Sequence, residues 1–377
     1  MIVAILGGGN IGTTMAGYLS HVGTCDEVRL YTHRPDEFDK HLLVHDVERQ
    51  QDYRADITLI SSDLEQVVTG ADVVCITFPH FMIDQTLRQM RPFVRKGAFV
   101  GIIPGSGGCE FFWKRYYDSD FTLFGFQRVP FIARYDVYGK ETSLKSMKPS
   151  VTTATIPIDH NQELSEIINH YFAIPCEMAS NFLAVTLTPS NPVLHTSRIY
   201  DLYYQSTPQT VFPECGFFYK DWTDHASQVL FGIDGELQSL LKRLDKIDLT
   251  AVKPLGVHYE SPTVPAMTHK ISHIPSFQLI ANTRLEVEGG WVADLKSRYF
   301  VEDFPWGLCI IKGFCEICGV ATPVTDTVLH WYEQYMGVHY FVDGKFCGKD
   351  LASTGIPQNY GIHTIDDIYA FYGTNKS

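Results

Sequence analysis

Two short motifs in the second half of the chain carry side chains that could transfer protons. The first, Pro189-Ser-Asn-Pro-Val-Leu-His195, breaks the chain at its Asn-Pro pair and places His195 at the start of an expected helix. Histidine is the natural proton donor near neutral pH. The chain has 15 histidines, however, and His258 and His269 compete for the same role, so position alone does not select His195.

The second motif, Glu302-Asp-Phe-Pro-Trp-Gly-Leu308, offers the Asp303 carboxylate in a turn between two apolar runs. This carboxylate could orient a histidine and stabilise its charged form. It could instead cap the helix expected to begin near Pro305, and local sequence alone favours the cap.

The first twenty residues predict a dinucleotide site that would supply a hydride. An apolar strand over Ile2 to Leu6 runs into Gly7-Gly-Gly-Asn-Ile-Gly12, and a helix follows. In such a unit the first glycine makes the tight turn, the second lets backbone approach a pyrophosphate, and the third lets helix pack on strand. The free N–H groups of the helix start then bind phosphate. The predicted cofactor-binding residues here are Gly7, Gly9, Asn10, Ile11 and Gly12.

The end of the second strand, Glu27 to Tyr31, indicates which dinucleotide binds. NAD-binding units place an acid there for the ribose hydroxyls, whereas this chain continues Thr32-His-Arg34-Pro. Arg34 could pair with a 2′-phosphate and Thr32 could hydrogen-bond to it, although a solvated loop arginine is the alternative. NADP(H) is therefore the preferred cofactor, with NAD(H) possible.

Two further strand ends in the first half are expected at the cofactor. The buried strand Ala71 to Phe78 ends at Phe78-Pro79, where the nicotinamide half would pass. The strand Ala98 to Ile103 ends in Pro104-Gly-Ser-Gly-Gly108. Gly105 is a candidate cofactor contact, and Gly107 and Gly108 are candidate substrate contacts; a bare tight turn explains these glycines equally well.

The alternation of strands and helices predicts an α/β fold with a Rossmann-type, doubly wound parallel sheet over residues 1–180. Further strands are expected at 57–60, 121–126 and 151–156, and helices at 63–68, capped by Ser61 or Ser62, at 84–94 and at 162–171. Longer helical patterns follow, at 231–249 and at 323–335 with Thr322 as cap, so residues 181–377 are expected to form a mostly helical substrate and catalytic domain.

Composition narrows the partners of the protein. The 377 residues carry a formal charge of −13, which argues against a nucleic-acid partner. No apolar run of membrane-spanning length occurs and the first strand leaves no room for a signal peptide, so we expect a cytoplasmic protein without membrane contact. Nine cysteines fit reduced thiols. Cys315 and Cys318 have metal-site spacing but no second pair, so buried packing is preferred and no metal is expected.

Five motifs in order resemble the octopine/nopaline (opine) dehydrogenase family over almost the whole chain. They are the opening glycine turn, 104–108, Asn-Pro-Val-Leu-His195, Arg298-Tyr-Phe-Val-Glu-Asp303-Phe-Pro-Trp-Gly-Leu and Thr322-Pro-Val-Thr-Asp326. The resemblance implies a Rossmann domain joined to an all-helical domain. It also implies NAD(P)H-dependent reductive condensation of an amino acid's α-amino group with a 2-oxo acid such as pyruvate.

The resemblance also implies roles for individual residues. His195 matches the catalytic histidine and Asp303 its carboxylate partner, although 108 positions separate them. Because both substrates carry carboxylates, a cation is needed, and Arg298 is the first choice. Arg134, Arg198 and Lys270 are weaker choices that are expected to be surface charges. A monomer or homodimer is expected.

Two other functions share the same amino end. Dehydrogenases resembling glycerol-3-phosphate or ketopantoate reductases also join a Rossmann domain to helices, but they use a catalytic lysine for which this chain shows no comparable motif. A non-enzymatic NADP(H)-sensing protein would need no paired histidine and aspartate. Residues 218–222 could form an aromatic wall for a substrate, although helix packing is the more common use of such a cluster.

Overall fold

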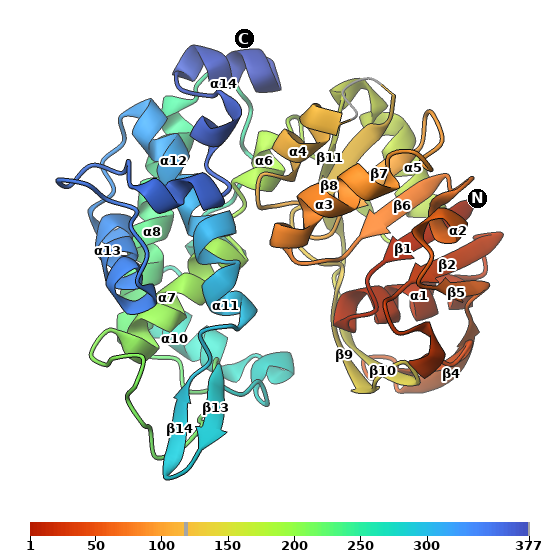
Figure 1. Cartoon of the computed structure of the whole chain (residues 1–377), viewed down its shortest axis with the longest axis horizontal. Coiled ribbons are helices and arrows are strands. Elements are labelled where there is room, and N and C mark those ends of the chain that lie inside the picture. The colour runs from red at the N-terminus through yellow and green to blue at the C-terminus, as the bar shows by residue number, and fades with distance from the viewer. Residues whose placement is uncertain (117–119, 376–377) are drawn as a thin grey trace. The chain divides into compact units, whose positions relative to one another are not determined.

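The computed structural model describes residues 1–116 and 120–375, which form two compact units, Met1–Thr186 and Leu187–Ser377 (Figure 1). The first is drawn in red to yellow-green and the second in green to blue. Each unit is described separately below.

Unit 1 is built on an eight-stranded sheet with the strand order β12-β11-β8-β7-β6-β1-β2-β5. All neighbours are parallel except β8 and β11, which run antiparallel. This is the predicted Rossmann-type α/β fold with one antiparallel pair. The strands are β1 (Ile2–Leu6), β2 (Glu27–Tyr31), β5 (Leu59–Ser61), β6 (Val73–Ile76), β7 (Phe99–Ile102), β8 (Thr122–Phe126), β11 (Val151–Ile156) and β12 (Cys176–Met178).

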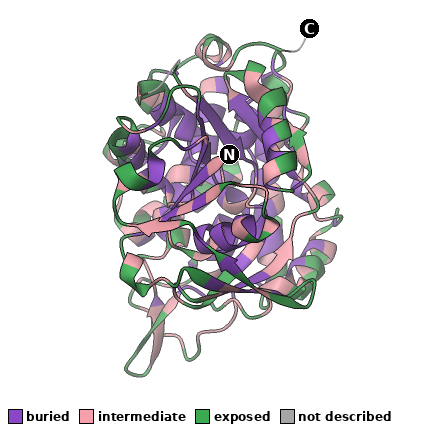
Figure 2. Ribbon diagram, turned by 90° about the vertical axis from the view of Figure 1, so that its right-hand side faces the viewer, coloured by how far each residue is buried: buried purple, intermediate pink, exposed green. Residues whose placement is uncertain are grey.

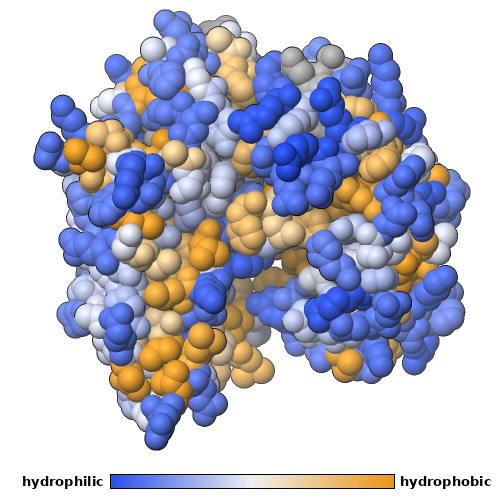
Figure 3. Space-filling view, in the orientation of Figure 1, coloured by the Kyte–Doolittle hydropathy of each residue, from blue (hydrophilic) through white to orange (hydrophobic). Residues whose placement is uncertain are grey.

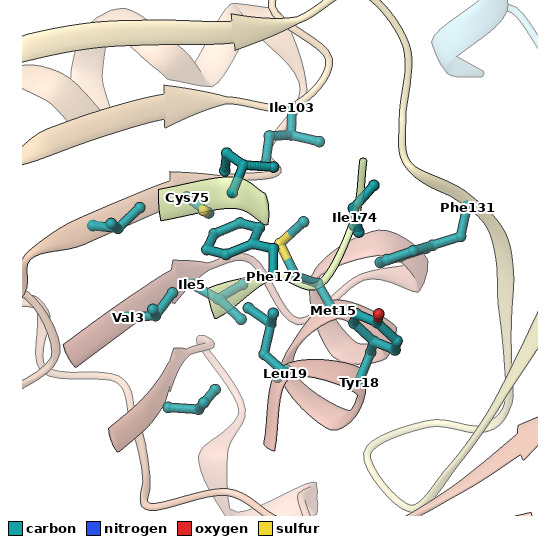
Figure 4. Packing of buried hydrophobic residues seen from close by; sticks show 14 of the residues in the cluster. Val3, Ile5, Met15, Tyr18, Leu19, Cys75, Ile103, Phe131, Phe172 and Ile174 are labelled. Carbon is teal, nitrogen blue, oxygen red and sulfur yellow. The ribbon is translucent and has the colours of Figure 1, made fainter. Parts of the chain in front are cut away.

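Both faces of this sheet are buried, which is why its central strands are continuous apolar runs. Val3 and Ile5 of β1 join one core cluster with Met15 and Leu19 of the first helix (Figure 4). The alternate residues Ala4 and Leu6, which point to the opposite face, are equally inaccessible. The central strands are accordingly coloured as buried in Figure 2.

Six α-helices belong to the described part of unit 1. They are α1 (Asn10–Val22), α2 (Leu64–Val68), α3 (His80–Met90), α4 (Cys109–Tyr116) and α5 (Asn161–Tyr171), followed by the short α6 (Leu183–Thr186) at the end of the unit. The prediction that Ser61 or Ser62 caps α2 is wrong, because the Asp63 carboxylate accepts the N–H groups of Glu65 and Gln66. The start of α3 at His80 also precedes the predicted start.

A second, four-stranded sheet packs on α1 and was not predicted. Its order is β4-β3-β10-β9, with β3 (His41–Asp46), β4 (Gln51–Asp56), β9 (Phe131–Val137) and β10 (Glu141–Met147). Gly17 allows the contact, because a Cβ atom there would lie 2.7 Å from Val44 and 3.0 Å from Leu42. The strand signal in the sequence is weak because few residues of these strands are apolar and buried: Leu42, Val44, Ala55, Phe131, Ala133 and Leu144.

Unit 2 is mainly helical, as predicted. Its helices are α7 (Asn191–Tyr203), α8 (Asp224–Arg243), α9 (Leu255–His258), α10 (Val264–His273), α11 (Arg298–Val301), α12 (Cys309–Cys318), α13 (Pro323–Met336) and α14 (Ile365–Tyr372), with a π turn, η4 (Phe304–Leu308), before α12. A hairpin of β13 (Arg284–Val287) and β14 (Gly290–Ala293) was not predicted.

The longest helix, α8, packs against α7, α10, α12 and α13 and so forms the centre of unit 2. The α8 carboxylate of Glu236 accepts the N–H groups of Val324 and Thr325 and caps α13. Thr322 occupies the predicted N-cap position with Pro323 behind it, but its hydroxyl donates to Asp326 and makes no side-chain cap. Exposed aliphatic side chains gather near the hairpin, where Figure 3 shows orange, and include Leu285, Val287 and Val211.

Among the described residues, no helix is both long and apolar enough to cross a bilayer. The described cysteines are all free thiols. Cys315 and Cys318 are buried in α12, and burial raises the pKa of Cys315 far above its usual range and that of Cys318 to about 11. Within the same residues, no three histidine, cysteine or carboxylate side chains converge as metal ligands would.

Candidate active site

The structure brings His195 and Asp303 together inside unit 2. Pro192 sits in the first turn of α7, where it costs no hydrogen bond, and His195 follows three residues later on the same helix. Its Nδ1 atom is 2.8 Å from Oδ2 of Asp303. Asp303 precedes the π turn η4 but makes no side-chain cap there. The helix-cap interpretation that local sequence favoured is therefore wrong.

This contact fixes the tautomer of the imidazole. An ionised aspartate only accepts hydrogen bonds, so Nδ1–H donates to Asp303 and Nε2 becomes the nitrogen that exchanges a proton. The side chains of both residues are still accessible, at 12% for His195 and 11% for Asp303. A shielded but reachable imidazole paired with a carboxylate can act as a general acid and base.

Aromatic rings enclose the imidazole. Tyr299 meets it edge-on at a centroid distance of 4.6 Å, and Phe218 meets it edge-on at 5.7 Å. The Tyr219 hydroxyl lies 2.8 Å from Nε2. The aromatic residues at 218–222 predict a substrate wall or helix packing, and no local signal links Tyr219 to a histidine 24 positions earlier.

Arg198 is not the surface charge that was predicted. Its guanidinium, 2% exposed, donates to the carbonyl oxygens of Phe218 (2.7 Å) and Phe217 (3.3 Å) and to the Asp201 carboxylate (2.6 Å). Burial lowers the pKa of Arg198, although the Asp201 carboxylate opposes this effect. All three guanidinium nitrogens donate to protein oxygens, two of them to the carbonyl groups of Phe217 and Phe218. Arg198 therefore fixes the segment that carries Tyr219.

Arg298, the predicted ligand for a substrate carboxylate, lies at the start of α11 with its side chain 58% exposed. It forms an ion pair with the buried Glu302. Desolvation works to lower the pKa of Arg298, but the carboxylates of Glu302 and Asp303 outweigh it and raise the pKa above its usual value. The guanidinium therefore stays charged and accessible beside the His195–Asp303 pair.

The glycine turn of unit 1 has the geometry of a phosphate cradle. Gly7 adopts φ +128°, which other residues avoid. A Cβ atom on Gly12 would lie 1.9 Å from the Gly7 carbonyl oxygen, whereas a Cβ on Gly9 would meet nothing within 4 Å. Gly12 thus permits helix packing and Gly9 leaves open space above the turn. The Asn10 side-chain oxygen accepts the Tyr135 N–H of β9, so its NH2 group and the backbone N–H groups at Asn10 and Ile11 remain as donors for a phosphate.

At the tip of β2, Arg34 is exposed and faces two partners. Its guanidinium lies 4.0 Å from the Tyr138 ring centroid and 3.3 Å from the Glu37 carboxylate. Thr32 is buried, and its hydroxyl lies 3.4 Å from the Tyr138 hydroxyl. Glu37 and Tyr138 were not predicted at this position, because they lie on a short 3₁₀ turn and on the hairpin of the second sheet.

The other predicted cofactor and substrate contacts lie at strand ends. Phe78 packs beside Gly7, and Pro79 immediately precedes α3. Packing alone already requires two of the glycines after β7: a Cβ on Gly105 would lie 2.5 Å from the Gly125 backbone, and one on Gly107 would lie 2.0 Å from the His80 ring. Gly107 and Gly108 both have positive φ.

The weaker candidates take no part in the His195 cluster. Lys270 pairs with Glu260 at 3.5 Å, and Arg134 donates to the carbonyl oxygen of its neighbour Ala133. His269 stacks on His273 along α10, and His258 packs against Tyr259.

A Rossmann-type unit with an open glycine turn and a helical unit with a histidine–aspartate pair together define an NAD(P)-dependent oxidoreductase. Comparison with known proteins gives the family. Residues 178–336 match the NAD/NADP octopine/nopaline dehydrogenase alpha-helical domain, and residues 2–105 match the NAD-dependent glycerol-3-phosphate dehydrogenase N-terminus. These matches support the octopine/nopaline dehydrogenase family and indicate an NAD(P)-dependent oxidoreductase acting on CH–NH bonds.

Full-length relatives support this assignment. The tauropine dehydrogenase of Arabella iricolor is 27% identical, over 98% of this chain and 100% of the relative. The octopine dehydrogenase of Pecten maximus is 26% identical, over 97% and 98%. The structure of octopine dehydrogenase in complex with NADH and agmatine superposes with a TM-score of 0.81 and 25% identity, over 98% of this chain and 97% of that one.

Proposed function

We propose that this protein joins the α-amino group of an amino acid to a 2-oxo acid such as pyruvate and reduces the product with NAD(P)H to a secondary amine dicarboxylate. The hydrogen bond between His195 and Asp303 carries this proposal. It supplies an oriented proton donor and acceptor, which imine formation and reduction both require.

The proton steps follow from the tautomer. The neutral Nε2 of His195 takes a proton from the ammonium group, so that the amine can attack the carbonyl carbon of the oxo acid. The resulting imidazolium returns this proton to the hydroxyl of the addition product, which leaves as water. Asp303 stabilises the imidazolium throughout and holds the ring in one orientation.

The cofactor fits the glycine turn of unit 1. The open space at Gly9 and the free N–H groups at the start of α1 suit a pyrophosphate. When bound, NAD(P)H supplies the hydride that reduces the imine carbon. Arg34 and Thr32 would hold the 2′-phosphate, so NADPH is the proposed preferred form. The exposed Glu37 beside Arg34 weakens this preference, because its carboxylate competes for the same guanidinium.

Arg298 would bind a substrate carboxylate. Its planar guanidinium remains charged, is largely exposed, and lies five residues before Asp303. Arg298→Gln should therefore raise the KM for the 2-oxo acid about 10- to 100-fold, while kcat at saturation changes less. A matched control is Arg134→Gln, an exposed arginine of unit 1, for which KM should stay unchanged. An equal fall in kcat for all oxo acids without a change in KM would contradict this role.

The proposed function is tested by following NADPH and NADH oxidation at 340 nm. Each amino acid is combined with pyruvate, 2-oxoglutarate or oxaloacetate, and the product is identified by mass spectrometry as the secondary amine. Oxidation should require both substrates together. Turnover with an oxo acid alone, giving a hydroxy acid, would instead place the chain with the small hydroxy-acid dehydrogenases.

A further inference from the structure

The second nitrogen of the His195 imidazole has a partner of its own in the fold. Nε2, the nitrogen left for proton exchange, lies 2.8 Å from the Tyr219 hydroxyl. Tyr219 is 4% exposed and its ring stacks on Phe277 at a centroid distance of 4.1 Å. We propose that Tyr219 is a further catalytic residue for the opine-forming reaction, which holds Nε2 in both protonation states of the imidazole and passes protons between Nε2 and the substrate.

A tyrosine hydroxyl suits this role because it can both donate and accept. It donates into the Nε2 lone pair of a neutral imidazole and accepts from Nε2–H of an imidazolium. The ring of His195 is then anchored at both nitrogens, by Asp303 and by Tyr219. Because the hydroxyl occupies the single lone pair of Nε2, a proton from the substrate reaches the ring through it: the tyrosine oxygen accepts that proton as its own proton moves to Nε2. The reverse shift returns the proton, so the tyrosine gains or loses no proton overall.

The position of Tyr219 is set by the same helix that carries His195. One turn further along α7, Arg198 donates to the carbonyl oxygens of Phe217 and Phe218, the two residues before Tyr219. The Asp221 carboxylate, two residues after Tyr219, accepts the Phe217 N–H and closes the turn. By holding these two carbonyl groups, the buried Arg198 guanidinium fixes the Tyr219 hydroxyl relative to the His195 imidazole.

The hydroxyl should favour the charged imidazole. Hydrogen bonds to ionised groups are about twice as strong as neutral ones. The titratable groups against the ring are Asp303, Tyr219 and Tyr299, and the nearby Arg298–Glu302 pair acts on Asp303 electrostatically.

Tyr219→Phe tests this role, which rests on the proposed function. The substitution keeps the stack on Phe277 and removes only the hydroxyl. For opine formation, kcat should fall about 10- to 100-fold with little change in the KM of either substrate. The acidic limb of the pH profile of kcat, where the imidazole must lose its proton, should move to lower pH by about half to one unit. An unmoved pH profile with normal kcat would overturn the proposal.

Tyr203→Phe is the matched control. Tyr203 is buried on α7, the helix that carries His195. Its hydroxyl donates to the Thr283 carbonyl oxygen at 2.9 Å and not to His195. This variant should lose comparable thermal stability but keep kcat within about twofold and leave the pH profile in place. Equal kinetic effects of the two substitutions would reduce Tyr219 to a structural residue and overturn the proposal.

A measurement without turnover separates the two proposals. In enzyme labelled with ¹⁵N-histidine, the His195 Nε2 signal, assigned by its loss in His195→Gln, should shift in Tyr219→Phe and stay in Tyr203→Phe. If the wild type makes no opine with any substrate pair but this signal shifts, the proposed function fails while the contact stands. An unchanged signal in Tyr219→Phe would exclude the Nε2 contact itself.

Discussion

The glycine turn of unit 1 and the histidine cluster of unit 2 are built in opposite ways. The turn uses backbone and empty space supplied by Gly7, Gly9 and Gly12, all within six consecutive residues. The cluster uses the side chains of His195, Tyr219 and Asp303, which come from three separate segments. A site made of consecutive backbone is visible in sequence, whereas a site made of distant side chains depends on the tertiary fold. Substitutions that separate these two kinds of construction follow, from the largest effect to the smallest.

Replacing the imidazole should give the largest effect. His195→Gln should lower kcat for opine formation about 10³- to 10⁴-fold, because the transferable proton is lost. Binding of NADPH, followed by quenching of protein fluorescence, should be unchanged, since no residue of the glycine turn is altered. A fall in both quantities would mean that the two sites are not built independently.

Asp303→Asn should lower kcat less than loss of the imidazole does, but more than any substitution in unit 1. An asparagine can present its amide to Nδ1 and favour the wrong tautomer, so kcat should fall about 100-fold. The melting temperature should move by only a few degrees, because Asp303 caps no helix. A large melting shift with normal kcat would restore the capping role.

Two glycine substitutions sharpen the comparison inside unit 1. Gly12→Ala pushes a Cβ atom into the Gly7 carbonyl oxygen and should destabilise the unit by about 3 kcal/mol. Gly9→Ala meets no protein atom, so its melting temperature should match that of the wild type. Both should weaken NADPH binding at least 10-fold, the second without a fold defect. Normal binding in Gly9→Ala would remove Gly9 from the cofactor site.

The smallest effects are expected at the tip of β2, where the charges are exposed. Arg34→Ala should raise the KM for NADPH about 10-fold and leave that for NADH nearly unchanged. Glu37→Gln should lower the KM for NADPH and improve selectivity for NADPH over NADH a few-fold, because the Glu37 carboxylate no longer competes with the 2′-phosphate for Arg34. Equal changes for both cofactors in either variant would contradict the proposed phosphate contact.

Sequence could predict the parts of this molecule whose signals are local. The strand–turn–helix at the amino end, the buried run of β6 and the helix that starts at Pro323 all follow from consecutive residues. The sheet of β3, β4, β9 and β10 could not be predicted, since few of its residues are apolar and buried. Its parallel pair, β3 and β10, also joins residues 98 positions apart, such as Leu43 and Glu141. Asp63, and not the predicted Ser61 or Ser62, caps α2 because its carboxylate accepts two N–H groups of that helix.

Prediction of the active site depended on family resemblance as well as on chemistry. Residue types suggested His195 and Asp303 separately, but only the resemblance paired them, and local rules favoured Asp303 as a cap. Tyr219 and Arg198 were beyond both arguments: nothing in the sequence shows that a guanidinium on α7 holds two carbonyl groups of a later loop. The roles of Tyr219 and Arg198 depend on contacts between segments that are separate in the sequence.

The packing of α1 between two sheets limits how far the amino-terminal unit can be shortened by a protein engineer. Asn10 accepts the Tyr135 N–H, and the helix covers Leu42 and Val44 through the gap at Gly17. Deleting the four-stranded sheet would expose the apolar side of α1 that packs on it, and such an exposed apolar surface promotes aggregation. Any minimal nucleotide-binding scaffold taken from this protein must therefore retain residues 41–56 and 131–147.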